Sequence, residues 1–422
     1  MPAFISLFAA RCRALLSSIR PVRLAPRGRA WRLGLASGAL AALATACGGG
    51  GGSVAGVGSG GTGAYTAGAI SGFGSIFVNG VEFDDRSAQL QDDEGQPVAR
   101  GGNALRLGMT VAIDSPTVST TTATPQAVAS TIQIGTELVG PVSAVDVTAR
   151  RVTVLGQTVQ VTATTVLDER LVGAGGLASL AGKVVVVYGL PGAGSGGPVA
   201  TRIEPAAEGL SVYKLRGLIS EINRPAATVR IDGATLVAQG GVALPAAWNP
   251  GSLVRVRLRT TPDALGRWVI ASVDSDEAPG SSRNGRDARL DGLVTGVTDA
   301  RNFQLNGVPV NLGELSADGR VQLGARIEVR GRFVAGVLQA TDIDVKDEAQ
   351  DSEREFDVRG VVSALDRASQ TLTVQGQVMA YGTARFDDGG PADLAVGGQV
   401  EVKARLAANG TRLVATRVKL AD

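Results

Sequence analysis

Hydrophobic and polar residues alternate with a period of two along much of the chain after residue 64. The stretches TVAID, VRVRLRT, IEVRGRF and VEVKARL are clear examples, and each places apolar side chains on one face of a strand. Turn glycines separate these stretches, and no stretch has a convincing helical period. The pattern therefore predicts an all-β protein of short antiparallel strands.

The alternation belongs to an internal repeat that occurs five times. Each copy opens with Gly-x-(Ile/Val)-(Ser/Thr), at Gly68, Gly140, Gly217, Gly292 and Gly360. A hairpin signal follows, at Asn79-Gly80, Leu155-Gly156, Asp232-Gly233, Asn306-Gly307 and Gln375-Gly376. Asn-Gly and Asp-Gly favour tight turns because both residues tolerate a positive φ.

Two further signatures complete each repeat. A turn glycine precedes a long alternating strand, at Gly108, Gly182, Gly251, Gly324 and Gly397. The closing strand carries Ala-(Ser/Thr)-x-(Ile/Val), beginning at Ala129, Ala200, Ala340 and Ala415, and the third copy has the shorter form Ala271 to Val273. We expect about five strands per repeat, and closure into a small OB-like β-barrel would remove the exposed strand edges. A small open sheet that packs on its neighbours is the alternative.

The expected organisation is therefore a leader, a tether and five tandem barrels. Its limits are 1–46 for the signal peptide, 47–64 for the glycine-rich tether, 65–137, 138–210 and 211–277 for the first three repeats, 278–287 for a linker, 288–345 for the fourth repeat, 346–354 for a second linker and 355–422 for the fifth repeat. No linker separates the first two repeats, so we expect that pair to pack together. The strand at residues 184–187 is apolar on both faces, which also favours burial against a neighbour.

The N-terminal region has the pattern of an export signal. A basic flank precedes the apolar run Leu33–Ala46, which is too short for a membrane span, and Cys47 follows directly. The small residues before Cys47 resemble a bacterial lipobox, and Gly48–Gly52 begin a flexible tether. This resemblance implies cleavage before Cys47, diacylation of that cysteine and anchoring to the outer membrane. An ordinary signal peptide that happens to contain a cysteine is the alternative.

Composition restricts the chemistry. The chain has no histidine, which excludes Ser-His-Asp and Cys-His catalysis and removes the commonest zinc ligand. Its two cysteines are Cys12 in the leader and Cys47. Seven of the 41 Lys and Arg residues lie in residues 1–32, so the rest carries 34 basic and 39 acidic residues, a net charge of −5. That balance gives no general attraction for nucleic acid.

The first two repeats carry a family resemblance. Residues 74–84 (GSIFVNGVEFD) and 142–168 (VSAVD, then VTVLGQTVQVTATTVLD) look like a bacterial domain-of-unknown-function family that is repeated in outer-membrane lipoproteins. The resemblance covers about Tyr65 to Asp422 and is weakest in the third repeat. It implies an OB-like barrel, no established activity and no catalytic residues.

Two other motifs are weak. Gly192–Gly197 fits G-x-G-x-x-G, but no helix is expected after it, so we interpret it as a loop. Acidic clusters occur at Asp84-Asp85, Asp92-Asp93-Glu94, Asp168-Glu169 and Asp387-Asp388. Solvated turns are the first interpretation of these clusters; a cation site or an acid/base pair is the alternative. We assign no catalytic residue, metal or cofactor.

The third repeat carries the best recognition candidate. Arg255, Arg257 and Arg259 alternate with apolar residues on one strand, and Lys214 and Arg216 do so on another. The first and fourth strands of an OB barrel are neighbours, so the five charges would share one surface. We predict a site for an anionic polymer or lipid head groups. In the alternative, this face is neutralised by acids of another repeat.

Together these patterns predict a lipid-anchored envelope protein that acts as a non-enzymatic binding or scaffolding module. Its expected partners are the membrane, through the N-terminal lipid, and an envelope polysaccharide or protein. A carboxylate-dependent enzyme acting on polysaccharide and an OB-type nucleic-acid-binding array are the alternatives, the latter disfavoured by charge and few aromatic residues.

Overall fold

The described chain is almost entirely β in class, with short strands joined by turns and loops and very little helix. The computed structural model describes residues 63–101, 104–192, 196–274, 283–347, 355–408 and 410–420. These residues belong to one compact unit, Ser59–Asp422. Cys12 and Cys47, the signal peptide and most of the tether lie outside the described residues, as do residues 193–195 of the glycine loop.

The second repeat shows the circuit most simply. Its strands are β8 (Leu138–Asp146), β9 (Arg151–Val154), β10 (Gln157–Leu167), β11 (Val184–Leu190) and β12 (Val199–Pro205). β8 pairs with β9, β9 with β10, β10 in parallel with β12, β12 with β11, and β11 again with β8. This closed five-strand order fits the predicted OB-like barrel. The open-sheet alternative is wrong for this repeat because the circuit leaves no edge strand.

One local expectation is corrected in this repeat. The sequence predicted no helix, but α1 (Glu169–Val172) and the 3-10 helix η1 (Gly173–Leu180) connect β10 to β11. Leu171 and Leu180 are buried in the core of this barrel. Two buried leucines in a short glycine-rich segment give too few positions for a helical period to stand out.

We number the strand groups as barrels in chain order, so that β8–β12 form barrel 2. The same pairing order recurs in barrels 3, 4 and 5. In barrel 1 the parallel pairing is divided between two short strand pairs. Barrel 1 contains β1 (Ala64–Phe73), β2 (Ile76–Val78), β3 (Val81–Asp84), β4 (Gln89–Gln91), β5 (Thr110–Ser115), β6 (Gln126–Val128) and β7 (Thr131–Gly135). Barrel 3 contains β13 (Val212–Asn223), β14 (Thr228–Ile231), β15 (Ala234–Ala238), β16 (Leu253–Arg259) and β17 (Trp268–Asp274).

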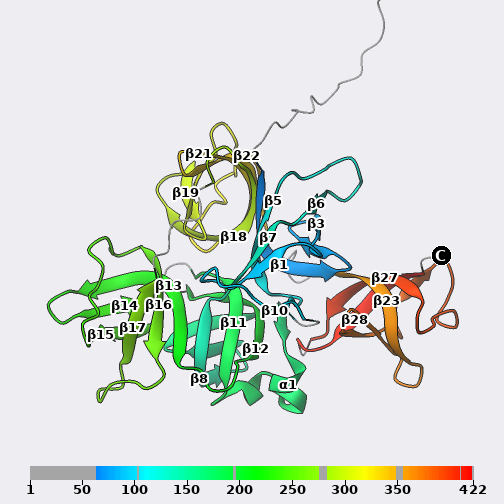
Figure 1. Cartoon of the computed structure of the whole chain (residues 1–422), viewed down its shortest axis with the longest axis horizontal. Coiled ribbons are helices and arrows are strands. Elements are labelled where there is room, and N and C mark those ends of the chain that lie inside the picture. The colour runs from blue at the N-terminus through cyan, green and yellow to red at the C-terminus, as the bar shows by residue number, and fades with distance from the viewer. Residues whose placement is uncertain are drawn as a thin grey trace, which may run out of the picture. The chain divides into compact units, whose positions relative to one another are not determined.

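Barrel 4 contains β18 (Asp287–Val297), β19 (Asn302–Leu305), β20 (Val308–Asn311), β21 (Arg326–Val334) and β22 (Val337–Val345), and its strands are seen curling around a centre in Figure 1. Barrel 5 contains β23 (Phe356–Asp366), β24 (Thr371–Val374), β25 (Gln377–Ala380), β26 (Arg385–Asp387), β27 (Gln399–Leu406) and β28 (Leu413–Leu420). The sequence-based domain limits stay predictions; the pairing shows which strands close together.

Strand pairs also join neighbouring barrels. β1 runs parallel to β18 over four residue pairs and to β23 over two, while β8 pairs with β13. Val186 of β11 packs against the core cluster that contains Ile70 of barrel 1. The doubly apolar strand at 184–187 therefore does contact a neighbour, as its sequence predicted.

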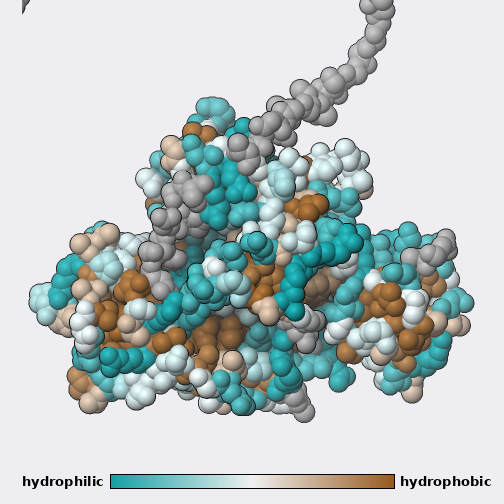
Figure 2. Space-filling model, viewed as in Figure 1, coloured by the Kyte–Doolittle hydropathy of each residue, from teal (hydrophilic) through white to brown (hydrophobic). Residues whose placement is uncertain are grey.

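The surface is mixed. On the face seen in Figure 2, hydrophilic residues predominate, and hydrophobic residues gather over parts of β8–β17 and β23–β28. Large exposed apolar side chains such as Leu265 and Val396 are scattered along the sequence, which is normal for a folded protein. Among the described residues, no helix is long and apolar enough to cross a membrane.

Candidate binding site between the barrels

The five predicted basic residues lie on two neighbouring strands of barrel 3. In the register of β13 with β16, Lys214 is opposite Arg257, Arg216 is opposite Arg255, and Val212 is opposite Arg259. The first and fourth strands of this barrel therefore do lie side by side, as the sequence predicted. We call Lys214, Arg216, Arg255, Arg257 and Arg259 the basic ladder. Like charges directly opposite each other repel, so this ladder needs acids or an anionic ligand.

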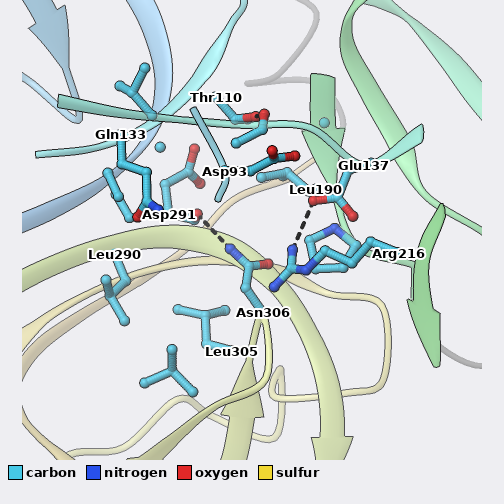
Figure 3. Close-up of a pocket in the computed structure, with 18 of the residues that line it drawn as sticks. Asp93, Thr110, Gln133, Glu137, Leu190, Arg216, Leu290, Asp291, Leu305 and Asn306 are labelled. Atoms are coloured by element: carbon cyan, nitrogen blue, oxygen red, sulfur yellow. Dashed lines mark hydrogen bonds and ion pairs between the residues drawn. The ribbon is translucent and has the colours of Figure 1, made fainter. Parts of the chain in front are cut away.

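Acids from earlier in the chain supply those charges. Asp93 contacts Lys214 at 2.7 Å and Arg255 at 3.4 Å. Glu94 contacts Lys214 at 2.7 Å and also pairs with Arg257. Glu137 is 2.8 Å from Arg216. Figure 3 draws this contact as a dashed line.

This arrangement matches the alternative in which acids of another repeat neutralise the basic face. Arg259 differs from the other four basic residues: it is exposed and has no ion pair within the described ranges. Anion binding by the group stays a prediction, and the contacts of four of its members do not support it.

A tight turn of barrel 1 presents the two acids. The Asp92 carboxylate accepts hydrogen bonds from the backbone N–H groups of Glu94 at 2.9 Å and Gln96 at 2.8 Å. The side chain of Asp93 is only 2% exposed. Burial alone would raise the pKa of Asp93, but the charge of Arg255 and the hydrogen bond from Lys214 outweigh it and hold the pKa below its usual value. Asp93 therefore belongs to a buried ion network and not to a solvated turn.

A cavity of about 490 Å³ lies beside this network. Arg216, Arg255, Asp93 and Glu137 contribute to its wall, and residues of barrels 1, 2 and 4 complete it. Figure 3 shows Thr110, Gln133, Leu190, Asp291 and Asn306 around the same space. The first four lie on strands of barrels 1, 2 and 4, and Asn306 lies in the turn between β19 and β20. The cavity has a suitable volume for a small molecule, because such sites typically span about 300–1,000 Å³.

A second ion network joins barrels 1 and 2. Arg202 contacts Asp168 at 2.9 Å and Glu204 at 2.7 Å, and Arg106 lies 3.2 Å from both carboxylates. Burial opposes ionisation of Asp168, but the hydrogen bond from Arg170 and the charge of Arg202 lower its pKa. Guanidinium groups on both carboxylates suit a structural joint better than a proton-transferring pair.

The remaining acidic clusters also meet arginines. The hydrogen bond from Arg86 lowers the pKa of Asp84 to about 2, and Asp387 pairs with Arg417. In the part of the chain that the structure describes, no group of three or more Cys, Asp or Glu side chains is placed to hold a metal ion.

Sequence reasoning missed the acids that face the basic ladder. Asp93 is 121 residues from Lys214, and Glu137 is 79 residues from Arg216. The cluster at residues 92–94 was visible, but no local pattern indicated its partner. The sequence did not indicate Gln133 or Asn306 as residues of a site. Asn306 was predicted only as part of a hairpin turn, and Gln133 belongs to no motif.

Comparisons with known proteins agree with a tandem arrangement. Residues 139–204, 291–344 and 359–419 each match a domain of unknown function, DUF5666. These segments fall in barrels 2, 4 and 5 and cover 181 of the 422 residues. No curated protein matches the chain.

The solved structures that match the chain include one of weak likeness. It is a multidomain protein with nucleic acid binding domains from Streptococcus pneumoniae, 12% identical, and the match covers 50% of this chain and 73% of that one. The TM-score is 0.13, which is too low to bear on fold or function.

Proposed function

We propose that the chain is a lipid-anchored protein of the bacterial outer membrane that serves as a non-enzymatic binding scaffold. In this proposal residues 1–46 direct export, Cys47 receives the lipid, and residues 48–64 are the tether. The basic flank, the short apolar run and the small residues before Cys47 support the anchor.

The main support for the scaffold role is a set of ion pairs between side chains of different barrels. Lys214, Arg216, Arg255 and Arg257 of barrel 3 pair with acids from residues 93–137. Together with the parallel pairing of β1 with β18, these contacts hold several barrels around one cavity. Such a frame suits binding, because a rigid wall lowers the entropy cost of ordering a site.

Acylation can be tested in cells by labelling with a palmitate analogue and by membrane fractionation. Cys47→Ala is expected to abolish labelling and to release the protein from the membrane fraction. Cys12→Ala is the matched control, because Cys12 is the only other cysteine and lies in the leader. Equal labelling of Cys47→Ala and the parent protein would exclude the anchor.

A further inference from the structure

The cavity beside the barrel 3 ladder has an electrically balanced wall. Three carboxylates line it, from Asp93, Glu137 and Asp291, and three guanidinium groups, from Arg216, Arg255 and Arg283. Asp291 is held by Arg326 at 2.7 Å, and the Arg283 guanidinium lies 3.9 Å from the centre of the Tyr65 ring. Charges of both signs in equal number create no strong net field, so the wall offers no net attraction to offset the desolvation of a charged ligand.

Uncharged polar groups interrupt the charged wall. The side-chain amide of the half-buried Gln133 lines the cavity and makes no hydrogen bond within the described ranges. Asn306 accepts a bond from the Leu293 N–H at 3.0 Å and donates one to the Asp291 carbonyl at 3.1 Å, which leaves one amide hydrogen. Arg255 is 9% exposed, and its Nε has no hydrogen-bond partner. The hydrogen-bonding capacity of this wall is therefore not exhausted by the protein.

Apolar groups form the rest of the lining. Leu190 and Pro191 come from the end of β11, while Leu290, Leu305 and Val308 come from barrel 4. Figure 3 shows Leu290 and Leu305 on one side of the space and Glu137 and Arg216 on another. A ligand that fits must offer hydrogen-bond donors and acceptors in one direction and C–H surface in another.

We propose that this cavity binds a neutral sugar unit of one or two residues. Vicinal hydroxyl groups donate and accept at once, which suits a wall of carboxylate, guanidinium and amide groups. The C–H face of a sugar ring can rest on the leucine and valine side chains. This inference rests on the proposed binding role and names its ligand class: a neutral glycan and not an anionic polymer.

The test uses the full-length protein and an array of neutral oligosaccharides, followed by calorimetric titration with each sugar that is retained. Glucose 6-phosphate and glucosamine provide anionic and cationic comparisons. We expect retention of at least one neutral sugar, with little change in affinity between about 0.05 M and about 0.5 M salt. Tighter binding of a charged sugar, or no retained neutral sugar, would overturn the proposal.

Gly135→Leu blocks the cavity without removing a charge. Gly135 lines the space, and a Cβ atom there would come no closer than 3.9 Å to another group. We expect sugar affinity to fall by at least about tenfold. Gly101→Leu is the matched control, because Gly101 is exposed, has open space around its Cβ position and is absent from this wall.

Gln133→Leu provides a second variant in case Gly135→Leu does not fold. It keeps the side-chain size but removes the amide, and we expect a several-fold loss of affinity. Unchanged sugar binding in both folded variants would place the ligand elsewhere and exclude this site. The outcome is separate from the acylation test, since purified protein with or without lipid can be titrated.

Discussion

At the scale of single residues, the opening glycine of each repeat makes room for the hairpin residue of the same repeat. A Cβ atom at Gly292 would lie 2.2 Å from the Asn306 amide nitrogen, and one at Gly68 would lie 2.2 Å from the Asn79 amide oxygen. Both asparagines adopt a positive φ and donate to a backbone carbonyl of the opening strand. The opening glycine and the Asn-Gly turn therefore depend on each other, because only a residue without a Cβ atom leaves room for the asparagine side chain.

Barrel 3 has Asp232 at this position, and a carboxylate cannot do all that an amide does. Asp232 accepts a hydrogen bond from the Leu218 N–H at 3.3 Å, but when ionised it has no hydrogen to donate. The equivalent backbone carbonyl, that of Arg216, instead accepts a bond from Gln157 of barrel 2 at 3.3 Å. Burial raises the pKa of Asp232 to about 7. The hydrogen bond from Leu218 acts in the opposite direction, and the charge of Glu137 adds to the increase.

This shift predicts a pH-dependent stability. The folded pKa of about 7 lies above the ordinary value of 3.8, so the folded state binds more protons between those two values. The free energy of unfolding therefore falls as pH rises from about 4 to about 7 and stays low above that. Asp232→Asn removes the charge and should stabilise the protein by about 1–3 kcal/mol at pH 8, with little effect at pH 4.

Urea unfolding of the parent and Asp232→Asn at both pH values, followed by fluorescence, measures this difference. Asp318→Asn is the matched control, because Asp318 is an exposed aspartate that also adopts a positive φ. An equal effect of Asp232→Asn at the two pH values would contradict the titration argument.

At the scale of elements, most of the strand plan could be predicted from the sequence because its signatures fix backbone hydrogen bonds. In barrel 4, the Gly324 N–H donates to the Val294 carbonyl at 2.9 Å, and the Val294 N–H donates to the Ala325 carbonyl at 2.9 Å. The same two bonds tie Gly397 to Val362 and Val362 to Gly398 in barrel 5. The opening signature and the turn glycine therefore lock the first strand to the start of the fourth.

A local hydrogen bond also explains the Ser or Thr at the fourth position of the opening signature. Ser143, Ser220 and Ser363 each donate to a carbonyl of the second strand of their barrel, at 3.1 to 3.3 Å. At each site the register between the first two strands shifts by a bulge. A small hydroxyl side chain bonds a carbonyl at the irregularity, which explains why Ser or Thr occupies this position.

The candidate site could be predicted only in part. Alternation on β13 and β16 placed Lys214, Arg216 and Arg255 near one another, because strand register follows from local pattern. What those charges face depends on how barrel 1 packs against barrel 3, and that contact joins residues more than 100 positions apart. No periodicity within a strand encodes such a contact.

We expect charge reversal to reduce stability more at the buried end of the basic ladder than at its exposed end. Arg255 contacts buried Asp93, so Arg255→Glu would place a carboxylate against another carboxylate and should cost about 3–5 kcal/mol. Arg259 lies on the same face of β16 but is exposed, so Arg259→Glu should change stability by less than about 0.5 kcal/mol.

Thermal melts followed by circular dichroism compare these two variants directly. The pair is matched in strand, residue type and substitution. Similar melting temperatures for Arg255→Glu and the parent would show that the contact between Asp93 and the ladder contributes little. A large loss in Arg259→Glu alone would show that the exposed end of the ladder has the structural role.

At the scale of the whole molecule, the barrels differ in how much they depend on their neighbours. Barrels 2 and 3 share one core cluster, whereas barrel 4 has a cluster of its own with Tyr65 from barrel 1. Barrels 1 and 5 also share one core cluster. The two barrels meet through two residue pairs between β1 and β23 and through the Arg359–Glu82 contact at 3.5 Å as well. The strands of barrel 5 nevertheless close a circuit among themselves, which favours independent folding.

A fragment from Glu355 to Asp422 is therefore expected to fold alone. Val358, Met379, Val402 and Val418 are fully buried, and their strands β23, β25, β27 and β28 pair within barrel 5. At 68 residues the fragment is near the lower size limit for a stable core, so it should melt below the full chain. Circular dichroism should show a β-type spectrum and a cooperative thermal transition. A disordered fragment would mean that the contact of β23 with β1 is required for folding, and that the barrels depend on one another as the units of a solenoid do.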